Sequence, residues 1–133
     1  MGNKDFGSWF SLKEKIHKKK QKVFFHEREV WWCSTGENIG FEQNGKGKEF
    51  TRPVIIIKRL SLDTCLIIPL TTSTKRKNTI LLDVLDKDKK SFAMVEQIRL
   101  IDAKRLGLKI GSISKSKFIE LVEFTKKINF SGI

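Results

Sequence analysis

Cysteine and histidine are scarce in this chain of 133 residues, which contains two of each. Cys33 and Cys65 are not spaced as a pair of metal ligands, so the sequence does not predict a structural zinc site. A domain of this length can bury a core without a disulfide. We therefore expect both cysteines to be reduced, half-buried strand residues of a single cytoplasmic domain.

Long hydrophobic runs are absent as well. No apolar segment approaches the roughly 20 residues that cross a bilayer, and the N-terminal segment lacks the apolar centre of a signal peptide. The sequence also has no phosphate-binding loop of the GxxxxGK type, no histidine-rich cluster and no paired carboxylates. These absences argue against a membrane protein, nucleotide hydrolysis and metal-assisted cleavage, and we expect neither a metal ion nor a cofactor.

Positive charge, in contrast, is abundant. The chain has 27 lysines and arginines against 15 aspartates and glutamates, which gives a net charge of +12. Such an excess favours a polyanionic partner, because cations that neutralise phosphates release bound counterions. The alternative is a basic surface that only keeps the protein soluble. Charge alone does not distinguish RNA from DNA or from an anionic membrane.

Apolar residues at helical spacing predict a helix over residues 8–22. Ser8 is its expected cap, and Trp9, Leu12 and Ile16 form a narrow apolar stripe among many lysines. This helix is expected either to dock on the domain with its lysines in solvent, or to act as an arm that binds a polyanion or a partner.

The remaining chain alternates short strands with glycine-rich or charged turns. We expect strands over residues 27–33, 53–58, 65–70, 79–84, 91–97 and 109–113. Asp102 is expected to cap a helical turn over residues 101–106, and an amphipathic C-terminal helix should begin after Ser114 or Ser116. This pattern predicts a mainly β fold with flanking helices, built as a small, partly open β-barrel.

Arg52 is the first candidate site residue. Because it precedes Pro53, its backbone is held extended at the start of a strand. The rigid fork of a guanidinium matches two phosphate oxygens. The alternative is an ordinary ion pair of Arg52 with Glu42 or Glu49.

Hydroxyl groups end the next apolar strand. Thr71 and Thr72 follow Pro69, where they could bind a phosphate or a ribose, or simply cap a turn. Lys75 and Arg76 come next, as a basic loop tip along which a nucleic-acid backbone could run. An arginine and a hydroxyl suit the attack of an RNA 2′-hydroxyl on its own phosphate, which needs no metal if the developing charge is stabilised.

Several sequence blocks occur together in a specific order. They are REVWW at 28–32, NIGFEQNG at 38–45, RPVIII at 52–57, PLT at 69–71, EQIRLID at 96–102, RL at 105–106 and IGSI at 110–113. Over residues 27 to 128 the chain resembles the MazF/PemK toxins of bacterial type II toxin–antitoxin systems. We therefore expect a basic N-terminal helical extension, residues 1–26, and a MazF/PemK-like toxin domain, residues 27–133.

The resemblance implies a CcdB/PemK-type SH3-like barrel that forms a homodimer. It also implies cleavage of single-stranded RNA at short sequences without a metal, which leaves 2′,3′-cyclic phosphate and 5′-hydroxyl ends. A cognate antitoxin would cover the RNA groove. By the same resemblance, Arg52 and Thr71 are the catalytic residues, and Glu42 and Gln43 line the groove.

The chain also departs from the family pattern. The segment between the E-Q pair and Arg52 is longer than usual and carries Lys46 and Lys48. Met94 stands where one branch of the family has a second arginine, two residues before Glu96. The expected RNA-binding residues are Glu42, Gln43, Lys46, Lys48, Thr72, Lys75 and Arg76.

Two alternative functions stay open on the sequence. One is a gyrase-poisoning protein like the CcdB relatives, which the match at Arg52 and Thr71 disfavours. The other is a catalytically silent RNA-binding module, which would show salt-dependent binding without a product.

Overall fold

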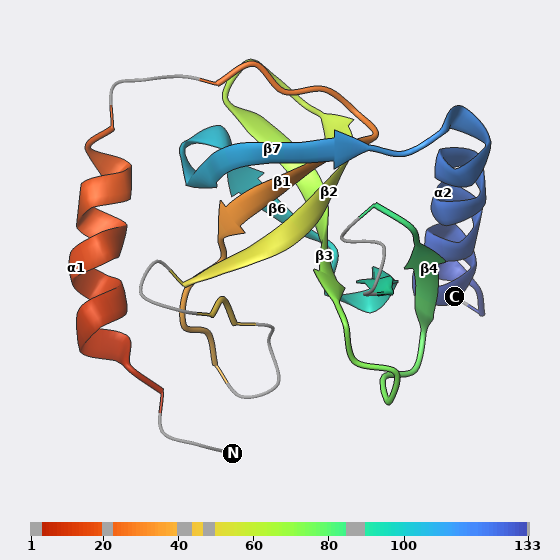
Figure 1. Ribbon diagram of the computed structural model, residues 1–133, viewed down its shortest axis with the longest axis horizontal. Helices are drawn as coiled ribbons and strands as arrows, with labels where there is room; N and C mark the ends of the chain where they lie inside the picture. The colour runs from red at the N-terminus through yellow and green to blue at the C-terminus, as the bar shows by residue number, and fades with distance from the viewer. Residues whose placement is uncertain (1–3, 20–22, 40–43, 47–49, 85–89, 133) are drawn as a thin grey trace.

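The computed structural model describes residues 4–19, 23–39, 44–46, 50–84 and 90–132. Its elements are α1 (Phe6–His17), β1 (Glu29–Ser34), β2 (Thr51–Arg59), β3 (Thr64–Thr71), β4 (Thr79–Leu82), β5 (Ser91–Met94), η1 (Val95–Gln97), β6 (Arg99–Asp102), η2 (Ala103–Arg105), β7 (Leu106–Ser112) and α2 (Lys115–Phe130). The strands form one antiparallel sheet in the order β4-β5-β3-β2-β1-β7, with β6 paired to β3. The two helices lie at opposite ends of this open sheet (Figure 1). The predicted mainly β fold with flanking helices is confirmed.

Strands β2 and β3 form the centre of the sheet, and both are apolar on both faces. Val54, Ile55 and Ile56 of β2 are all completely buried. Because neighbouring side chains of a strand point to opposite faces, each face needs its own core. One core contains Val54 and Ile56, and the other contains Ile55 together with Leu121 of α2. The helix α2 begins after Ser114, whose side chain accepts a hydrogen bond from the Lys117 amide at 3.2 Å.

The strand β6 is not among the predicted strands. Residues 101–106 were expected to form only a helical turn, but Arg99–Asp102 pairs with β3 before the turn begins. The turn itself is present as η2, and the Asp102 side chain caps it by accepting from the Lys104 amide at 2.9 Å. A strand of four residues with one buried side chain, Ile101, gives too little alternation to be recognised locally.

The helix α1 packs on the domain. It begins at Phe6 rather than at the predicted Ser8, because Asp5 is the residue that caps it by accepting from the Ser8 amide at 3.0 Å. Trp9 and Ile16 are buried together with Phe50, which lies just before β2. The structure therefore shows α1 docked on the domain, with Lys13, Lys15, Lys18 and Lys19 exposed to solvent.

Contacts at both ends of α1 hold it against η2 and β1. The Arg105 guanidinium lies 5.5 Å from the centre of the Trp9 ring and donates to the Ser34 carbonyl at 3.0 Å. Near the helix end, Lys104 donates to the His17 carbonyl at 3.0 Å. Gly36 is required beneath the indole: its φ is +80°, and a Cβ there would lie 2.3 Å from ring atoms of Trp9.

Both cysteines lie inside the core, which corrects the expectation of half-buried positions. Cys33 and Cys65 have no exposed surface and are free thiols. Cys33 of β1 and Cys65 of β3 face the core because they lie on the same side of the sheet as Val54 and Ile67. Burial raises the pKa of each thiol to about 12. Neither described helix is long and apolar enough to span a membrane.

The Gly36→Ala variant should lose about 3 kcal/mol of unfolding free energy, because alanine is strained at positive φ and its methyl displaces the indole. Denaturant unfolding followed by tryptophan fluorescence measures this loss. Gly111→Ala is the control, since a Cβ there meets nothing within 4 Å. Equal stability of the two variants would contradict the packing of α1 described above.

Native Cys33 and Cys65 should resist a thiol reagent at pH 8 that labels both in denaturant.

Because folding raises both pKa values, the folded thiols stay protonated between about pH 9 and 12 while unfolded thiols ionise. Stability from this source is therefore complete below pH 9 and falls as pH rises. Unfolding free energies at pH 8 and 10 should differ less in a variant carrying Cys33→Ala and Cys65→Ala than in the natural chain.

Candidate functional site

The two predicted catalytic residues lie at the paired ends of β2 and β3. Val54 pairs with Pro69, and continuing this antiparallel register by two residues places Arg52 across from Thr71. Residues directly opposite in an antiparallel pair point to the same face. The register thus directs the Arg52 and Thr71 side chains to the same face of the sheet, and the Arg52 guanidinium reaches the end of β3 through its hydrogen bond to the Leu70 carbonyl.

Arg52 is buried, with 6% of its surface exposed. Its Nε donates to the Asn44 carbonyl at 2.9 Å and its Nη1 to the Leu70 carbonyl at 3.0 Å. Burial, together with the positive charge of Arg76, lowers the pKa of Arg52 to about 10. At neutral pH the side chain is still charged. The alternative partners Glu42 and Glu49 lie outside the described residues, and no ion pair joins Arg52 to an acid within the described ranges.

Thr71 is also nearly buried, with 9% of its surface exposed. Its Oγ1 accepts a hydrogen bond from the Ser73 amide at 3.1 Å, so the hydroxyl does cap a turn, which was the alternative role. A hydroxyl that accepts can still donate its own proton. The turn bond orients Oγ1 and leaves it able to donate to an anion beside Arg52.

The predicted RNA-binding residues are only partly described. Thr72, Lys75 and Arg76 are exposed in the loop after β3. Lys46 is exposed too, and its backbone pairs with Thr51, directly before Arg52. The structure thus brings Arg76 and Lys46 to the same end of the sheet as Arg52. The other three, Glu42, Gln43 and Lys48, lie outside the described residues.

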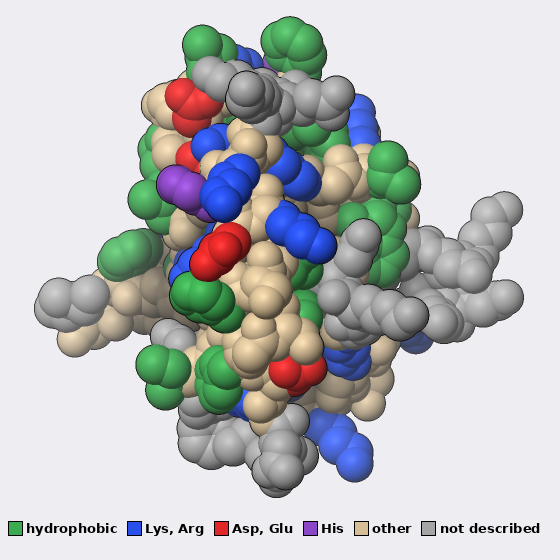
Figure 2. All heavy atoms as spheres, turned by 90° about the vertical axis from the view of Figure 1, so that its left-hand side faces the viewer, with side chains coloured by type: hydrophobic (Ala, Val, Ile, Leu, Met, Phe, Trp, Pro, Cys, Tyr) green, Lys and Arg blue, Asp and Glu red, His purple; other side chains and the backbone are tan. Residues whose placement is uncertain are grey.

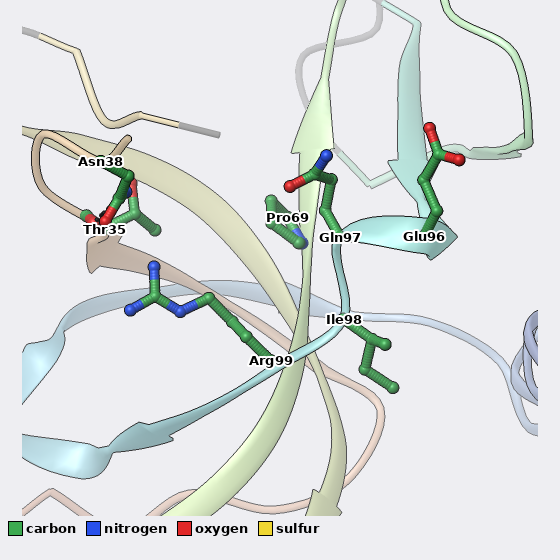
Figure 3. Close-up of a pocket in the computed structure, with 7 residues that line it drawn as sticks. All are labelled: Thr35, Asn38, Pro69, Glu96, Gln97, Ile98 and Arg99. Carbon is green, nitrogen blue, oxygen red and sulfur yellow. Dashed lines mark hydrogen bonds between the residues drawn. The ribbon is translucent and has the colours of Figure 1, made fainter. Parts of the chain in front are cut away.

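A cavity of about 410 Å³ opens beside this end of β3. It is lined by Thr35, Asn38, Pro69, Glu96, Gln97, Ile98 and Arg99. Figure 3 shows Thr35 and Asn38 on one side, and on the other Gln97 at the end of η1 with Ile98 and Arg99 after it. Pro69 lies between these two sides and two residues before Thr71, so the cavity adjoins the candidate catalytic pair.

Arg99 is a candidate residue that the sequence reasoning missed. It pairs with Ile67 in β6, and its guanidinium points toward Thr35 and Asn38 (Figure 3). The Arg99 guanidinium makes no hydrogen bond or ion pair with another described residue. Burial lowers the pKa of Arg105, and the positive charge of Arg99 contributes to this shift. The available signal was its place two residues before the buried Ile101, on the core side of the strand.

Thr35 gives a second indication that the cavity accepts a polar ligand. Its surface is 1% exposed, and its Oγ1 has no hydrogen-bond partner among the described residues. A buried hydroxyl without a partner costs about 1–3 kcal/mol, so it is retained at a cost to stability. A ligand group in the cavity reaches this hydroxyl only if the Thr35 side chain turns toward it.

The residues of the family's acidic block have structural surroundings of their own. Met94 is buried in the core, with 1% of its surface exposed. Glu96 accepts from the Asn78 side-chain amide at 3.1 Å, which ties the loop after β3 to η1. Among the described residues no three histidine, cysteine or acidic side chains are grouped to hold a metal ion.

The charges of this region suit an anion. Arg52, Arg76 and Arg99 approach it from three different segments, and Glu96 is the single acid among the residues that line the cavity. Guanidinium groups bind non-bridging phosphate oxygens through paired hydrogen bonds. The arrangement can therefore hold a phosphodiester and stabilise negative charge that develops on it.

Comparisons with known proteins bear on the family and on the fold. A family model described as PemK-like, MazF-like toxin of type II toxin–antitoxin system matches residues 26–128. No curated protein matches the chain.

Three solved structures share the fold. The toxin MazF-mt6 of Mycobacterium tuberculosis is 21% identical over 75% of this chain and 94% of its own, with a TM-score of 0.57. MazF of Deinococcus radiodurans is 13% identical over 80% and 97%, with a TM-score of 0.65. An endoribonuclease in complex with its cognate antitoxin, from a mycobacterial species, is 11% identical over 83% and 98%, with a TM-score of 0.57.

The Thr35→Val variant should be at least as stable as the natural chain, because it replaces an unpartnered buried hydroxyl with a methyl group. It should at the same time bind single-stranded RNA more weakly. The matched control is Thr125→Val: the Thr125 hydroxyl is buried but donates to the Leu121 carbonyl at 2.7 Å. That variant should lose about 1 kcal/mol of unfolding free energy without losing RNA affinity. Unchanged RNA affinity in Thr35→Val would remove the cavity from the binding site.

Proposed function

The chain belongs to the PemK-like, MazF-like toxins of type II toxin–antitoxin systems, a family of endoribonucleases, and on this premise we propose that it cleaves single-stranded RNA without a metal ion. The observation that supports the proposal is the register of β2 and β3, in which Arg52 and Thr71 each lie two residues from the Val54–Pro69 pair, together with the bond from Arg52 to the Leu70 carbonyl. A cavity lined by Arg99 adjoins them.

In the proposed reaction the ribose 2′-oxygen attacks the neighbouring phosphorus and loses its proton. The bond from phosphorus to the 5′-oxygen breaks, and that oxygen gains a proton. The products are a 2′,3′-cyclic phosphate and a 5′-hydroxyl. Since both the nucleophile and the leaving group belong to the RNA, the protein needs only to align the phosphate and stabilise its charge.

Arg52 is assigned the larger share of that task. Its guanidinium stabilises the pentacoordinate phosphorus and helps to protonate the leaving oxygen. A pKa of about 10 makes it a stronger acid than an ordinary arginine, because burial destabilises its charged form. Asn44 must move aside for a phosphate to reach Nε, since its carbonyl occupies that donor in the structure.

The other residues position the substrate. Thr71 donates its hydroxyl proton to a non-bridging oxygen while the Ser73 amide holds Oγ1 in place. The strand would then run over Gln43 and along Lys75 and Arg76, which the loop after β3 presents to solvent. Glu42, Lys46, Lys48 and Thr72 are assigned to the walls of the same groove.

The partners follow from the family. We propose a cognate antitoxin, acidic or amphipathic, that covers the RNA groove; the similar mycobacterial endoribonuclease is in complex with its own antitoxin. A homodimer, a cytoplasmic location and the division into residues 1–26 and 27–133 belong to the same proposal. The family match from residue 26 supports that boundary.

The purified protein should cut single-stranded RNA in EDTA and leave cyclic-phosphate ends. Arg52→Ala should lower the cleavage rate on the order of 100- to 1,000-fold, the usual effect of removing one preorganised donor. Arg59→Ala is the matched control. It removes the same charge from the opposite end of β2, where the guanidinium lies 5.5 Å from the Phe25 ring.

Three outcomes would decide against this assignment. Full cleavage by Arg52→Ala would exclude that arginine from the reaction. Salt-dependent RNA binding without any product would favour the catalytically silent module. Toxicity relieved by a gyrase mutation, with no RNA cleavage, would favour a gyrase poison.

A further inference from the structure

A second groove lies between α1 and the segment that follows β1. Its volume is about 400 Å³. It is lined by Phe6, Trp9, Phe10, Lys13, Glu37, Asn38, Ile39, Arg99 and Arg105. We refer to it as the α1 groove. Figure 2 shows the side of the molecule on which α1 lies, where lysine and arginine side chains spread across the surface beside hydrophobic ones.

The α1 groove adjoins the cavity of the candidate site, because the two share part of their lining. Asn38 and Arg99 line both of them. Arg99 therefore lies at the junction, with one side toward Pro69 and the candidate catalytic pair and the other toward α1. A single extended ligand can occupy the two spaces in succession.

Two phenylalanines give the α1 groove its aromatic wall. Phe6 and Phe10 are 51% and 62% exposed, and their spacing of four places them on the same face of α1. The same helix already has an apolar stripe buried against the domain through Trp9 and Ile16. The two exposed rings are thus not used for folding. Flat aromatic surfaces in a basic groove are typical platforms on which the bases of single strands stack.

Cations line the same groove. Lys13 lies one turn beyond Phe10 on α1. Arg99 lines the groove from β6 and Arg105 from η2, and Glu37 is the one acid among the lining residues. Arg105 is fixed by its contact with the Trp9 ring and by its bond to the Ser34 carbonyl. Alternating cations and aromatic rings match a strand in which phosphates and bases alternate. This pattern favours RNA over an acidic peptide, because carboxylate side chains carry no flat ring that could stack on Phe6 or Phe10.

The platform is also rigid before any ligand arrives. Trp9 packs at 5.6 Å between ring centres on Phe50 and against Gly36, so α1 cannot slide without opening that cluster. Lys104 and Lys19 tie its C-terminal end to η2 through hydrogen bonds of 3.0 and 3.2 Å. A ligand that stacks there loses its own freedom but does not have to order the helix.

We propose that the α1 groove binds a nucleotide of the RNA substrate outside the cleaved linkage, with its base stacked on Phe6 or Phe10. Lys13 and Arg99 contact the phosphates that join this nucleotide to the cleaved one. The proposal rests on the proposed endoribonuclease function, and it gives the basic N-terminal helix a direct role in substrate binding. The groove makes the protein favour RNA that extends beyond the cut site.

The test compares a variant carrying Phe6→Ser and Phe10→Ser with the natural chain. The probes are fluorescein-labelled, mixed-sequence 2′-O-methyl RNAs of different lengths, which lack the free nucleophile and so are not cut. The natural chain should gain affinity with length until the strand fills both spaces. The variant should bind the longer probes on the order of 10-fold more weakly, as expected for the loss of one stacked base. Both should bind the shortest probes equally.

Two controls separate stacking from general damage. Phe130→Ser removes a phenylalanine that is 64% exposed at the end of α2, and should leave RNA affinity unchanged. Lys13→Glu tests the α1 groove without altering an aromatic residue. It should weaken binding of long probes and reduce the dependence of affinity on salt, whereas Lys127→Glu on α2 should do so much less. Thermal unfolding of every variant should match the natural chain.

The outcomes distinguish this proposal from the one it rests on. If the natural chain neither cuts nor binds RNA, the proposed function fails and the α1 groove proposal fails with it. If the natural chain cuts RNA but the Phe6→Ser, Phe10→Ser variant binds probes of every length as tightly, only the α1 groove proposal is overturned. It is likewise overturned if the variant keeps its RNA affinity and loses inhibition by its antitoxin, since the groove would then be a protein-docking site.

Discussion

The antiparallel pairing of β2 with β3 is the interaction on which the rest of this structure depends. Both strands bury apolar side chains on both faces, so their register is fixed by two cores at once. A shift of one residue would turn Val54 and Ile67 away from their core and carry Arg52 to the other face. The bond from Arg52 to the Leu70 carbonyl closes the same pair at its end. Hydrophobic packing of the centre thus determines which polar groups meet at the edge.

The N-terminal helix extends this logic to the loop beside the site. Phe50 has a positive φ of 52°, which is unfavourable for a bulky residue, yet its carbonyl accepts from the amides of both Thr35 and Gly36. Its ring packs on Trp9. The helix therefore helps to hold a strained residue that lies two positions before Arg52. An extension outside the family match contributes in this way to the shape of the region in which the candidate residues lie.

Local pattern and tertiary structure contributed differently to the predictions. The central strands were predictable because runs such as residues 54–57 are β-branched and apolar throughout. The strand β6 was not, since its pairing with β3 comes from residues more than 30 positions earlier. The full burial of Cys33 and Cys65 had the same cause: one face of each strand is covered by elements that the strand itself does not specify. The predicted cap of α1 was wrong because Asp5 and Ser8 are both favourable capping residues. In the structure the helix begins at Phe6, so Asp5 is the residue that caps it.

The sequence by itself determined the class of fold, the family, the excess of positive charge and the two strand ends that carry Arg52 and Thr71. Only the tertiary structure decided that Arg99 points into a cavity that Thr35 also lines, and that Arg99 lines the groove beside α1 as well. The physical reason is one of distance along the chain. Periodicity and turn chemistry act over a few residues. The surroundings of a side chain such as Arg99 are made by segments that meet only when the whole chain folds.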